Sequence, residues 1–368
     1  MHVTSNHPLE AGLTHDSRLI TAYRGTRPDV TPVWFMRQAG RSLPEYRALR
    51  VGTQMLDACL TPELASEITL QPVRRHGVDA GIFFSDIVVP LKQVGVDVEI
   101  VPGRGPVLGK AVRTPADVAE LIAHDPAQLE DTLAPIVEAV GLTVAELGST
   151  PLIGFAGAPF TLAAYLVEGG PSKDHIHART MMHAEPEAWA ALMRWTAQVT
   201  GIFLRTQILA GASAAQLFDS WAGSLSRADY EAHVAPASRL ALEYVHDIRY
   251  TVATPEGRET RDLSVVHFGV GTGEILKPMH EVGADVVGVD YRIPLDEASR
   301  RLGGTVPVQG NIDPALLAAP WEVLEQHVRE IHARGLSAPS HVMNLGHGVP
   351  PETDPAVLTR IVELVHSL

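Results

Sequence analysis

The sequence predicts an α/β protein, a single-domain (β/α)8 TIM barrel with its active site at the C-terminal ends of the strands. Short apolar runs alternate with longer stretches of helical periodicity along 368 residues. The apolar runs are continuous, as in parallel strands buried on both faces. Eight runs are expected to be strands: 33–36, 80–84, 151–155, 213–218, 264–268, 286–289, 306–309 and 341–345. A doubly wound sheet is the alternative architecture.

Helical stretches separate the expected strands. Several have start signals, such as Thr61 before Pro62 and Thr114 before Pro115. The helical patterns cover 62–76, 116–124, 129–147, 185–210, 227–248, 274–282, 313–332 and 354–367.

Two connections between these elements have distinct compositions. The insert 93–108 combines β character with turn residues, which predicts a hairpin, whereas 251–262 reads as a polar connection. No linker is long enough to divide the chain. We therefore expect one catalytic barrel domain over 16–368, preceded by a flexible leader over 1–15.

Composition excludes several classes of protein. The net charge is −14 and no run of Lys and Arg stands out, so nucleic acid is not an expected partner. No apolar run is long enough to span a membrane, and the first residues lack the apolar core of a secretory signal. One cysteine, Cys59, leaves no intrachain disulfide and no multi-cysteine metal site. A cytoplasmic protein is expected.

Two arginines follow the first apolar run at once. Arg37 and Arg41 come directly after 33–36, with a glycine between them. Guanidinium groups offer a planar fork of donors that suits carboxylate or phosphate. A structural ion pair is the simpler reading of any one arginine, but the position of both at a strand end favours an anionic ligand.

A carboxylate follows the second apolar run. Asp86 lies in FFSDIVVP with apolar residues on both sides, where an unpaired carboxylate is costly. A helix cap or an ion pair would explain it alone. With Arg37 and Arg41 expected one strand away, a role in the site is favoured.

Two further loops hold candidate ligand-binding side chains. Residues 154–162 turn a strand into a helix through glycine and alanine, and Tyr165 follows on that helix. An ordinary buried tyrosine and a ligand-binding one are equally consistent with this position. His347 lies between two glycines after the last strand, which favours ligand contact.

Two patterns imitate other sites. Residues 264–290 run from a strand through spaced glycines to a helix, as in a dinucleotide-binding fold, but Glu274 replaces the third glycine. A βα turn within a barrel explains the same pattern. Asp174, His175, His177 and His183 suggest a metal, yet they follow a glycine-rich loop, and a solvated loop or lid is favoured.

Taken together, these motifs resemble those of the uroporphyrinogen decarboxylase family. PVWFMRQAGRSLPEY and GFAGAPFTLAAYLVEGG are similar to its two signature segments, and FFSDIVVP, FDSWAG, HFGVGTGE, QGNIDP and NLGHGV to its other blocks in order. The resemblance implies a homodimeric (β/α)8 barrel. It implies removal of four acetate carboxyl groups from uroporphyrinogen III, giving coproporphyrinogen III for haem synthesis, with no metal or organic cofactor.

The resemblance also implies roles for particular residues. Asp86 would stabilise a cationic pyrrole, and Arg37 would bind substrate and take part in catalysis. The other substrate-binding positions that it implies are Gln38, Ala39, Gly40, Arg41, Tyr165, Phe218, Ser220 and His347.

Two other functions fit the same scaffold. A corrinoid-dependent methyltransferase would hold zinc through His and Cys side chains, but Cys59 lies far from any late His-x-Cys arrangement. A tetrapyrrole carrier would have lost its acid–base groups, yet Asp86 and both arginines are present.

Overall fold

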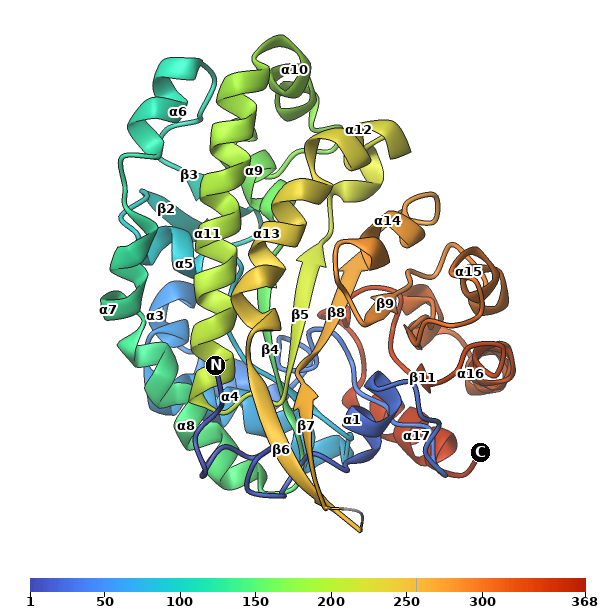
Figure 1. Ribbon diagram of the computed structural model, residues 1–368. Helices are drawn as coiled ribbons and strands as arrows, with labels where there is room; N and C mark the ends of the chain where they lie inside the picture. The colour runs from blue at the N-terminus through green and yellow to red at the C-terminus, as the bar shows by residue number, and fades with distance from the viewer. Residues whose placement is uncertain (256) are drawn as a thin grey trace.

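The computed structural model describes residues 1–255 and 257–368, and a sheet of parallel strands lies at its centre (Figure 1). The strand order is β1-β4-β5-β8-β9-β10-β11, so neighbours in the sheet follow one another along the chain, as the βα alternation predicts. The strands are β1 (Gly81–Ile82), β4 (Leu152–Gly157), β5 (Ala214–Asp219), β8 (Ser264–Gly269), β9 (Val286–Gly288), β10 (Val308–Gln309) and β11 (His341–Val342).

The sheet is curled rather than flat. Gln216 lies on β5 and Gln309 on β10, three strand positions apart in the order. A flat sheet would separate them by roughly 14 Å, since neighbouring strands lie about 4.8 Å apart. Instead, Nε2 of Gln309 donates a hydrogen bond to Oε1 of Gln216 over 3.0 Å. The two side chains therefore meet on the concave side of the sheet.

The first predicted strand, 33–36, is not a regular strand. Val33 forms an isolated parallel bridge with Met343, and its carbonyl accepts a hydrogen bond from the Asp79 amide at 2.9 Å. The Trp34 amide still donates to the Met343 carbonyl at 3.3 Å, but from Phe35 on side chains take the amides: the Phe35 amide donates to Gln38 Oε1 and the Met36 amide to Asn344 Oδ1, each at 2.9 Å. Because these side chains use the backbone donors, no ladder continues through the segment.

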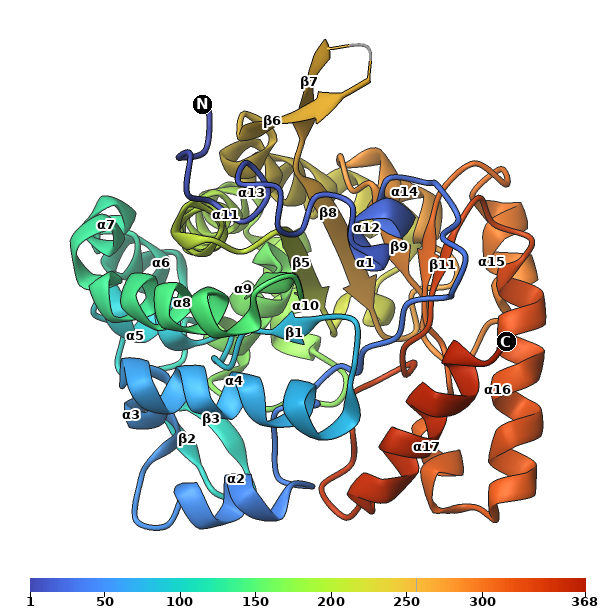
Figure 2. The same cartoon turned by 90° about the horizontal axis from the view of Figure 1, so that it is seen from below.

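Helices surround the strands (Figure 2). They are α1 (Arg18–Tyr23), α2 (Pro44–Leu49), α3 (Met55–Cys59), α4 (Pro62–His76), α5 (Val89–Gln93), α6 (Pro115–Leu121), α7 (Leu129–Thr132), α8 (Ala134–Leu147), α9 (Pro159–Glu168), α10 (Ile176–Ala184), α11 (Pro186–Ala210), α12 (Arg227–His233), α13 (Ala235–His246), α14 (Leu276–Glu281), α15 (Leu295–Arg301), α16 (Trp321–Gly335) and α17 (Pro355–His366), with 3-10 turns η1 (Pro126–Gln128), η2 (Ala222–Ser224) and η3 (Pro314–Ala318).

Proline explains where the helices depart from prediction. The stretch 129–147 divides into α7 and α8, and 227–248 divides into α12 and α13. In each case a proline occupies the first turn of the second helix, where its missing amide does no harm, whereas inside one longer helix it would break a hydrogen bond. The stretch 313–332 likewise becomes η3 followed by α16.

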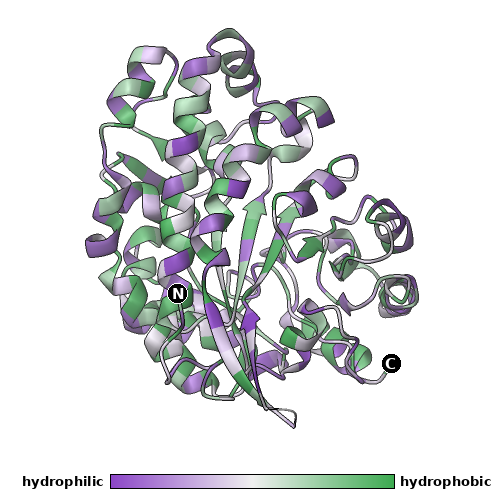
Figure 3. Ribbon diagram, viewed as in Figure 1, coloured by the Kyte–Doolittle hydropathy of each residue, from purple (hydrophilic) through white to green (hydrophobic). Residues whose placement is uncertain are grey.

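The core lies between the strands and the helices that cover them. Every residue of β4 and β8 is buried, and α11 packs on β4, α9 and α13. Figure 3 shows the apolar strands inside and polar residues on the outer helix faces. Across 1–255 and 257–368, no helix has both the length and the apolar character that crossing a bilayer requires.

Two antiparallel hairpins accompany the main sheet. The insert 93–108 contains β2 (Val98–Val101) and β3 (Gly105–Leu108), as predicted. The interpretation of 251–262 as a polar connection is wrong, because β6 (Arg249–Thr254) and β7 (Gly257–Asp262) pair there. Buried side chains alternate with more exposed ones along β6, so one polar-looking segment still offers an apolar face.

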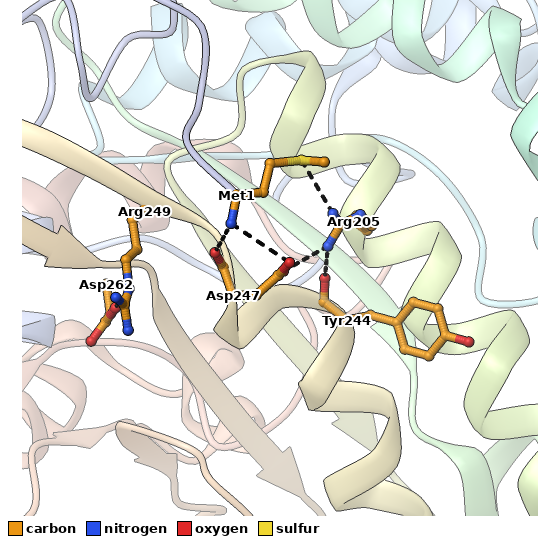
Figure 4. A network of polar contacts seen from close by, with 6 residues as sticks. All are labelled: Met1, Arg205, Tyr244, Asp247, Arg249 and Asp262. Carbon is orange, nitrogen blue, oxygen red and sulfur yellow. Dashed lines mark hydrogen bonds and ion pairs between the residues drawn. The ribbon is translucent and has the colours of Figure 1, made fainter.

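The N-terminal residues lie against the start of this hairpin. The Met1 amino group donates to the Asp247 carbonyl at 2.6 Å, and Arg205 contacts the Asp247 carboxylate at 2.7 Å (Figure 4). Val3 and Leu9 are buried. The leader thus has defined contacts, and its flexibility stays a prediction.

Candidate active site

The predicted site residues lie where parallel strands end. The arrowheads of β5 and β8 point toward the end of the molecule that carries α10, α12 and α14 (Figure 1). Asp86 follows β1, Ser220 follows β5 and His347 follows β11. Because parallel strands direct their C-terminal ends to one side, residues distant in the chain share this face.

Arg37 occupies an unusual backbone position. Its φ is 60°, in the left-handed region that a non-glycine residue seldom adopts. Its side chain lies against Gly348, where an added Cβ would be 2.8 Å from Cγ of Arg37. The guanidinium has no ion pair with any carboxylate of the residues described. Glycine at 348 therefore leaves room for an exposed cation at the mouth of the sheet.

Asp86 is half-buried and held by the backbone. Its Oδ1 accepts a hydrogen bond from the Val88 amide over 3.0 Å, and its own carbonyl accepts one from Val89 at the start of α5. Burial raises the pKa of the Asp86 carboxyl above its ordinary value, while the Val88 hydrogen bond and the charge of Arg37 act against this rise. Asp86 has no ion-pair partner in the part of the chain described. The result is a carboxylate fixed by the backbone and near enough to Arg37 to feel its charge, with no ion pair between the two among the described residues.

Tyr165 is positioned by α9 and by an aromatic neighbour. Its ring stacks on Trp221 with centroids 3.9 Å apart and an interplanar angle of 25°. Burial raises the pKa of Tyr165 to about 12, and the nearby Asp86 charge adds to the effect while Arg37 opposes it. Tyr165 is therefore a neutral hydroxyl at physiological pH, and it shares one electrostatic environment with Asp86 and Arg37.

His347 completes the group around Arg37. Burial lowers the pKa of its imidazole, and the charges of Arg37 and Arg292 lower it further, while Asp290 raises it. Nδ1 of His347 accepts the Gly348 amide at 2.7 Å, so Nε2 is the free position of the ring. A neutral imidazole in a cationic setting gains its proton most readily when an anion binds beside it.

Phe218 and Ser220 lie at the end of β5. The Phe218 ring meets Phe155 and Phe268 edge-on, with centroids 5.4 Å and 6.0 Å away. Between them in sequence, Asp219 is fully buried and accepts the Thr161 hydroxyl at 2.9 Å. This bond ties the start of α9 to the end of β5. The half-buried Phe218 and Ser220 are thereby presented at the mouth.

The residues that follow Arg37 divide into two groups. Gln38 is fully buried and its amide spans the Phe35 amide and the Ala80 carbonyl, so its side chain holds the loop. Ala39 and Gly40 are half-buried and offer only backbone. Arg41 is exposed, and its charge acts on Tyr46. Burial raises the pKa of Tyr46, Arg50 lowers it, and Arg41 lowers it to a smaller extent. The structure thus gathers Arg37, rather than Arg41, with Asp86.

Two groups at this face, Asp290 and Arg292, are not among the predicted site residues. Asp290 is buried, accepts the Gly271 amide at 2.7 Å and pairs with Arg292. This carboxylate therefore fixes the glycine turn after β8. The pattern that imitated a dinucleotide-binding fold is thus a βα turn of the central sheet, and β8 lies between β5 and β9. A strand-end position was the available signal for both groups.

The interpretation of 174–183 as a solvated loop is wrong in two respects: Ile176–Ala184 form the helix α10, and His175 is not solvated. Its side chain is buried, its φ is 49°, and its ring lies 4.3 Å from the Trp221 ring, centroid to centroid. Trp221 is therefore packed between His175 and Tyr165. The four groups of this stretch do not form a metal-ligating set in the described residues.

The fold is that of an α/β protein with a curled parallel sheet, and its candidate active site lies at the C-terminal ends of the strands. A family model described as "Uroporphyrinogen decarboxylase (URO-D)" matches residues 14–368. The chain belongs to this family.

Relatives support the assignment over nearly the whole length. A uroporphyrinogen decarboxylase of Leifsonia xyli subsp. xyli is 71% identical over 98% of this chain and 97% of its own. One from Arthrobacter sp. is 66% identical over 97% of this chain and 99% of its own. Among solved structures, a methyltransferase from Methanosarcina mazei has a TM-score of 0.78 at 18% identity, covering 96% of this chain and 99% of that one. At that identity the last likeness concerns the fold alone.

Proposed function

We propose that the chain is a carboxy-lyase that converts the four acetate side chains of uroporphyrinogen III to methyl groups. The products are coproporphyrinogen III and carbon dioxide, in the synthesis of haem. Membership of the family supports the reaction. The observation that carries the proposal is Asp86, a carboxylate held by the Val88 amide and facing Arg37 with no ion pair among the described residues.

The chemistry requires an electron sink. When an acetate arm loses carbon dioxide, the electron pair of the broken C–C bond must be accepted. A pyrrole protonated at a ring carbon is a cation that accepts this pair, and a second proton then converts the exocyclic carbon to a methyl group. The ring carbon finally returns its proton. No external oxidant or reductant is needed.

Asp86 is proposed to stabilise the protonated pyrrole. A carboxylate beside pyrrole N–H groups favours positive charge on the ring, and a preorganised group of this kind lowers the barrier more than solvent does. Burial raises the pKa of Asp86, because the ionised carboxylate is less stable away from water. An incoming cationic ring offsets that cost, so the carboxylate interacts more strongly with the intermediate than with the neutral substrate.

The remaining residues are proposed to bind the substrate's carboxylates and ring. Arg37 binds a carboxylate next to the reacting pyrrole and takes part in catalysis, while Arg41, farther out, binds a second one. The side chains proposed to bind carboxylates at the rim are Tyr165, Ser220 and His347. The Phe218 ring is proposed to lie against the macrocycle. The loop backbone proposed to line the pocket is that of Gln38, Ala39 and Gly40. The cationic rim explains how an acidic protein holds a polyanion.

We also propose a closed barrel in which 33–36 is the eighth strand and lies between β11 and β1. The contacts of Val33 with Met343 and with Asp79 support this closure, because they reach toward both edges of the sheet. The catalytic domain then spans 16–368 after the leader 1–15. A homodimer, a cytoplasmic location, and the lack of any metal or organic cofactor in the reaction belong to the same proposal.

The decisive experiment measures turnover of uroporphyrinogen III by the purified full chain after treatment with a chelator. We expect coproporphyrinogen III, with intermediates that have lost one to three carboxyl groups. Activity that returned only with zinc or a cobamide would favour a methyltransferase-like reaction instead. Binding of the substrate without any carbon dioxide release would favour a carrier.

A further inference from the structure

A cluster of three metal-ligating side chains lies outside the candidate active site. His183 is in the last turn of α10, and Asp229 and His233 are on α12. One ligand atom from each lies within 4.8 Å of the other two. None of the three belongs to the proposed machinery around Asp86. We propose that this cluster binds one zinc ion, or a similar first-row transition metal.

The positions of the three side chains follow from the two helices. Asp229 and His233 are four residues apart, so they lie on one face of α12. The Ser226 hydroxyl accepts the Asp229 amide at 3.1 Å and fixes the start of this helix. The Trp189 indole donates to the His233 carbonyl at 3.1 Å and fixes its end. His183 approaches from α10, with its ring edge-to-face with that of His233 at a centroid separation of 5.5 Å.

The distances suit a small tetrahedral ion. Zinc binds imidazole nitrogen at about 2.0–2.1 Å and carboxylate oxygen at about 2.0–2.2 Å, so two such ligands lie about 3.3–3.5 Å apart. Nε2 of His183 and Oδ1 of Asp229 are 3.3 Å apart. The His183 side chain is 57% exposed, so its ring has room to turn toward a shared ion, while Asp229 and His233 are half-buried and held more firmly.

The ligand set selects the class of metal. Two imidazoles and one carboxylate suit zinc, copper, nickel or iron, whereas magnesium and calcium prefer sites made of oxygen alone. Three protein ligands on an exposed surface leave a fourth position to water. The −14 net charge of the chain also favours cations at its surface.

A bound metal would join two segments that lie beyond the C-terminal ends of the strands, on the side of the candidate active site. α10 follows His175, and η2 and α12 follow Trp221, the ring on which His175 packs. Figure 1 shows α10 and α12 together beyond the C-terminal end of β5. The His175–Trp221 contact is one tie between these segments, and the metal would be a second one on the outer surface. The expected consequence is a more rigid cover beside Tyr165.

The test is a titration of the chelator-treated full chain with zinc chloride by calorimetry. We expect one zinc ion per chain with a dissociation constant on the order of micromolar, and a rise in melting temperature of about 2–5 °C at saturation. Magnesium should give neither effect. Cobalt should give visible absorption bands of a low-coordinate site.

Variants identify the ligands. His183→Ala, Asp229→Asn and His233→Ala should each weaken zinc binding at least about tenfold. The matched control is His177→Ala, an exposed histidine on α10 outside the cluster, which should bind zinc as the parent does. Circular dichroism of the metal-free variants checks that each is folded.

Several results would overturn the proposal. One is the lack of saturable one-to-one binding by the parent. Another is an unchanged affinity in all three variants, which would show that zinc binds to other histidines. If His177→Ala weakened zinc binding as much as the three cluster variants, the binding would be unspecific. The contact between His183 and Asp229 would then be interpreted as an ion pair alone.

Discussion

The curled sheet holds two polar clusters that differ in how their side chains are satisfied. In the interior cluster, the Tyr23 hydroxyl donates to Oε1 of Gln309 at 2.5 Å, and the Trp34 indole donates to the same oxygen at 3.1 Å. Nε2 of Gln309 then donates to Gln216. These groups are bonded to one another, and the Gln216 amide nitrogen is the member left without a partner among the described residues.

The cluster at the mouth has the opposite character. Arg37 and Asp86 carry full charges, lie close enough for one to affect the pKa of the other, and yet form no ion pair within the described parts of the chain. Among the described residues, the Asp86 carboxylate accepts a single hydrogen bond, from the Val88 amide.

The polar groups of the two clusters serve two different purposes. Groups that satisfy one another hold a single packing arrangement, and removing one costs stability. Charged groups kept apart and unpaired cost stability as they stand, and this cost is offset when a ligand of complementary charge binds. Changes in the interior cluster should therefore lower stability and leave activity unchanged, whereas changes at the mouth should lower activity without lowering stability.

The largest expected effect is that of Asp86→Asn. Asparagine keeps the size and the acceptor for the Val88 amide but removes the charge that stabilises the cationic ring. We expect kcat to fall by about 10²–10³-fold, with KM nearly unchanged. Steady-state kinetics with uroporphyrinogen III measures both constants.

Asp285→Asn is the matched control for this change. Asp285 precedes β9, and its carboxylate accepts the Val265 amide at 2.8 Å, so it resembles Asp86 but lies at the other end of the strands. We expect full activity in this variant. Unchanged turnover in Asp86→Asn would remove the cation-stabilising role from the mechanism.

Arg37→Ala should impair both binding and turnover. Each hydrogen bond to a charged group contributes about 1.5–3 kcal/mol, so we expect KM to rise and kcat/KM to fall by at least about 10–100-fold. Arg329→Ala is the control, since Arg329 is paired with Glu325 on the surface of α16. A fall in kcat/KM no larger than that of Arg329→Ala would contradict the assignment.

Tyr23→Phe tests the interior cluster. The change removes the hydroxyl from Gln309 and Trp34 and leaves buried polar atoms with fewer partners. We expect the free energy of unfolding to fall by about 1–3 kcal/mol, with KM and kcat unchanged. Urea denaturation gives the first quantity and kinetics the second. A variant of parental stability but altered KM would reverse the distinction between the clusters.

Much of this arrangement could be predicted from the sequence, because it depends on local patterns. Continuous apolar runs located the sheet strands, and the polar residues just after them located Asp86 and His347. In a parallel sheet, knowing the strand ends is enough to bring those residues to one face.

The parts that could not be predicted depend on long-range contacts. The break in 33–36 arises because Asn344, more than three hundred residues later, takes the Met36 amide. His183 on α10 meets Asp229 on α12 across 46 positions of the chain, and the buried His175 packs on Trp221, which is equally far away in sequence. No local pattern of 174–183 distinguishes these outcomes from a solvated loop.

Gly348→Ala sharpens the comparison without replacing a charged residue. An added methyl would collide with the Arg37 side chain and displace the guanidinium. We expect KM to rise about three- to tenfold, corresponding to a cost of about 1 kcal/mol for an off-rotamer side chain. Gly141→Ala is the control: it lies in α8 with open space around it, and should raise helix stability slightly. Equal KM values in the two variants would show that Arg37 needs no room at Gly348.

The smallest expected effect is a displaced acid limb of the pH profile. Asp86 acts as an anion, and burial raises its pKa above the ordinary value of 3.8. Activity should therefore be present above the raised pKa and fall as pH decreases through it, in kcat/KM for the free enzyme. In kcat the limb should lie at lower pH, because pyrrole N–H groups of the bound substrate beside Asp86 favour its ionised form. The Tyr165 hydroxyl, with a pKa of about 12, should add no alkaline limb in the physiological range. If the limb in kcat lay at higher pH than the limb in kcat/KM, the bound ring would not favour the ionised form of Asp86. The unpaired charges at the mouth would then have no demonstrated function, in contrast to the paired groups of the interior.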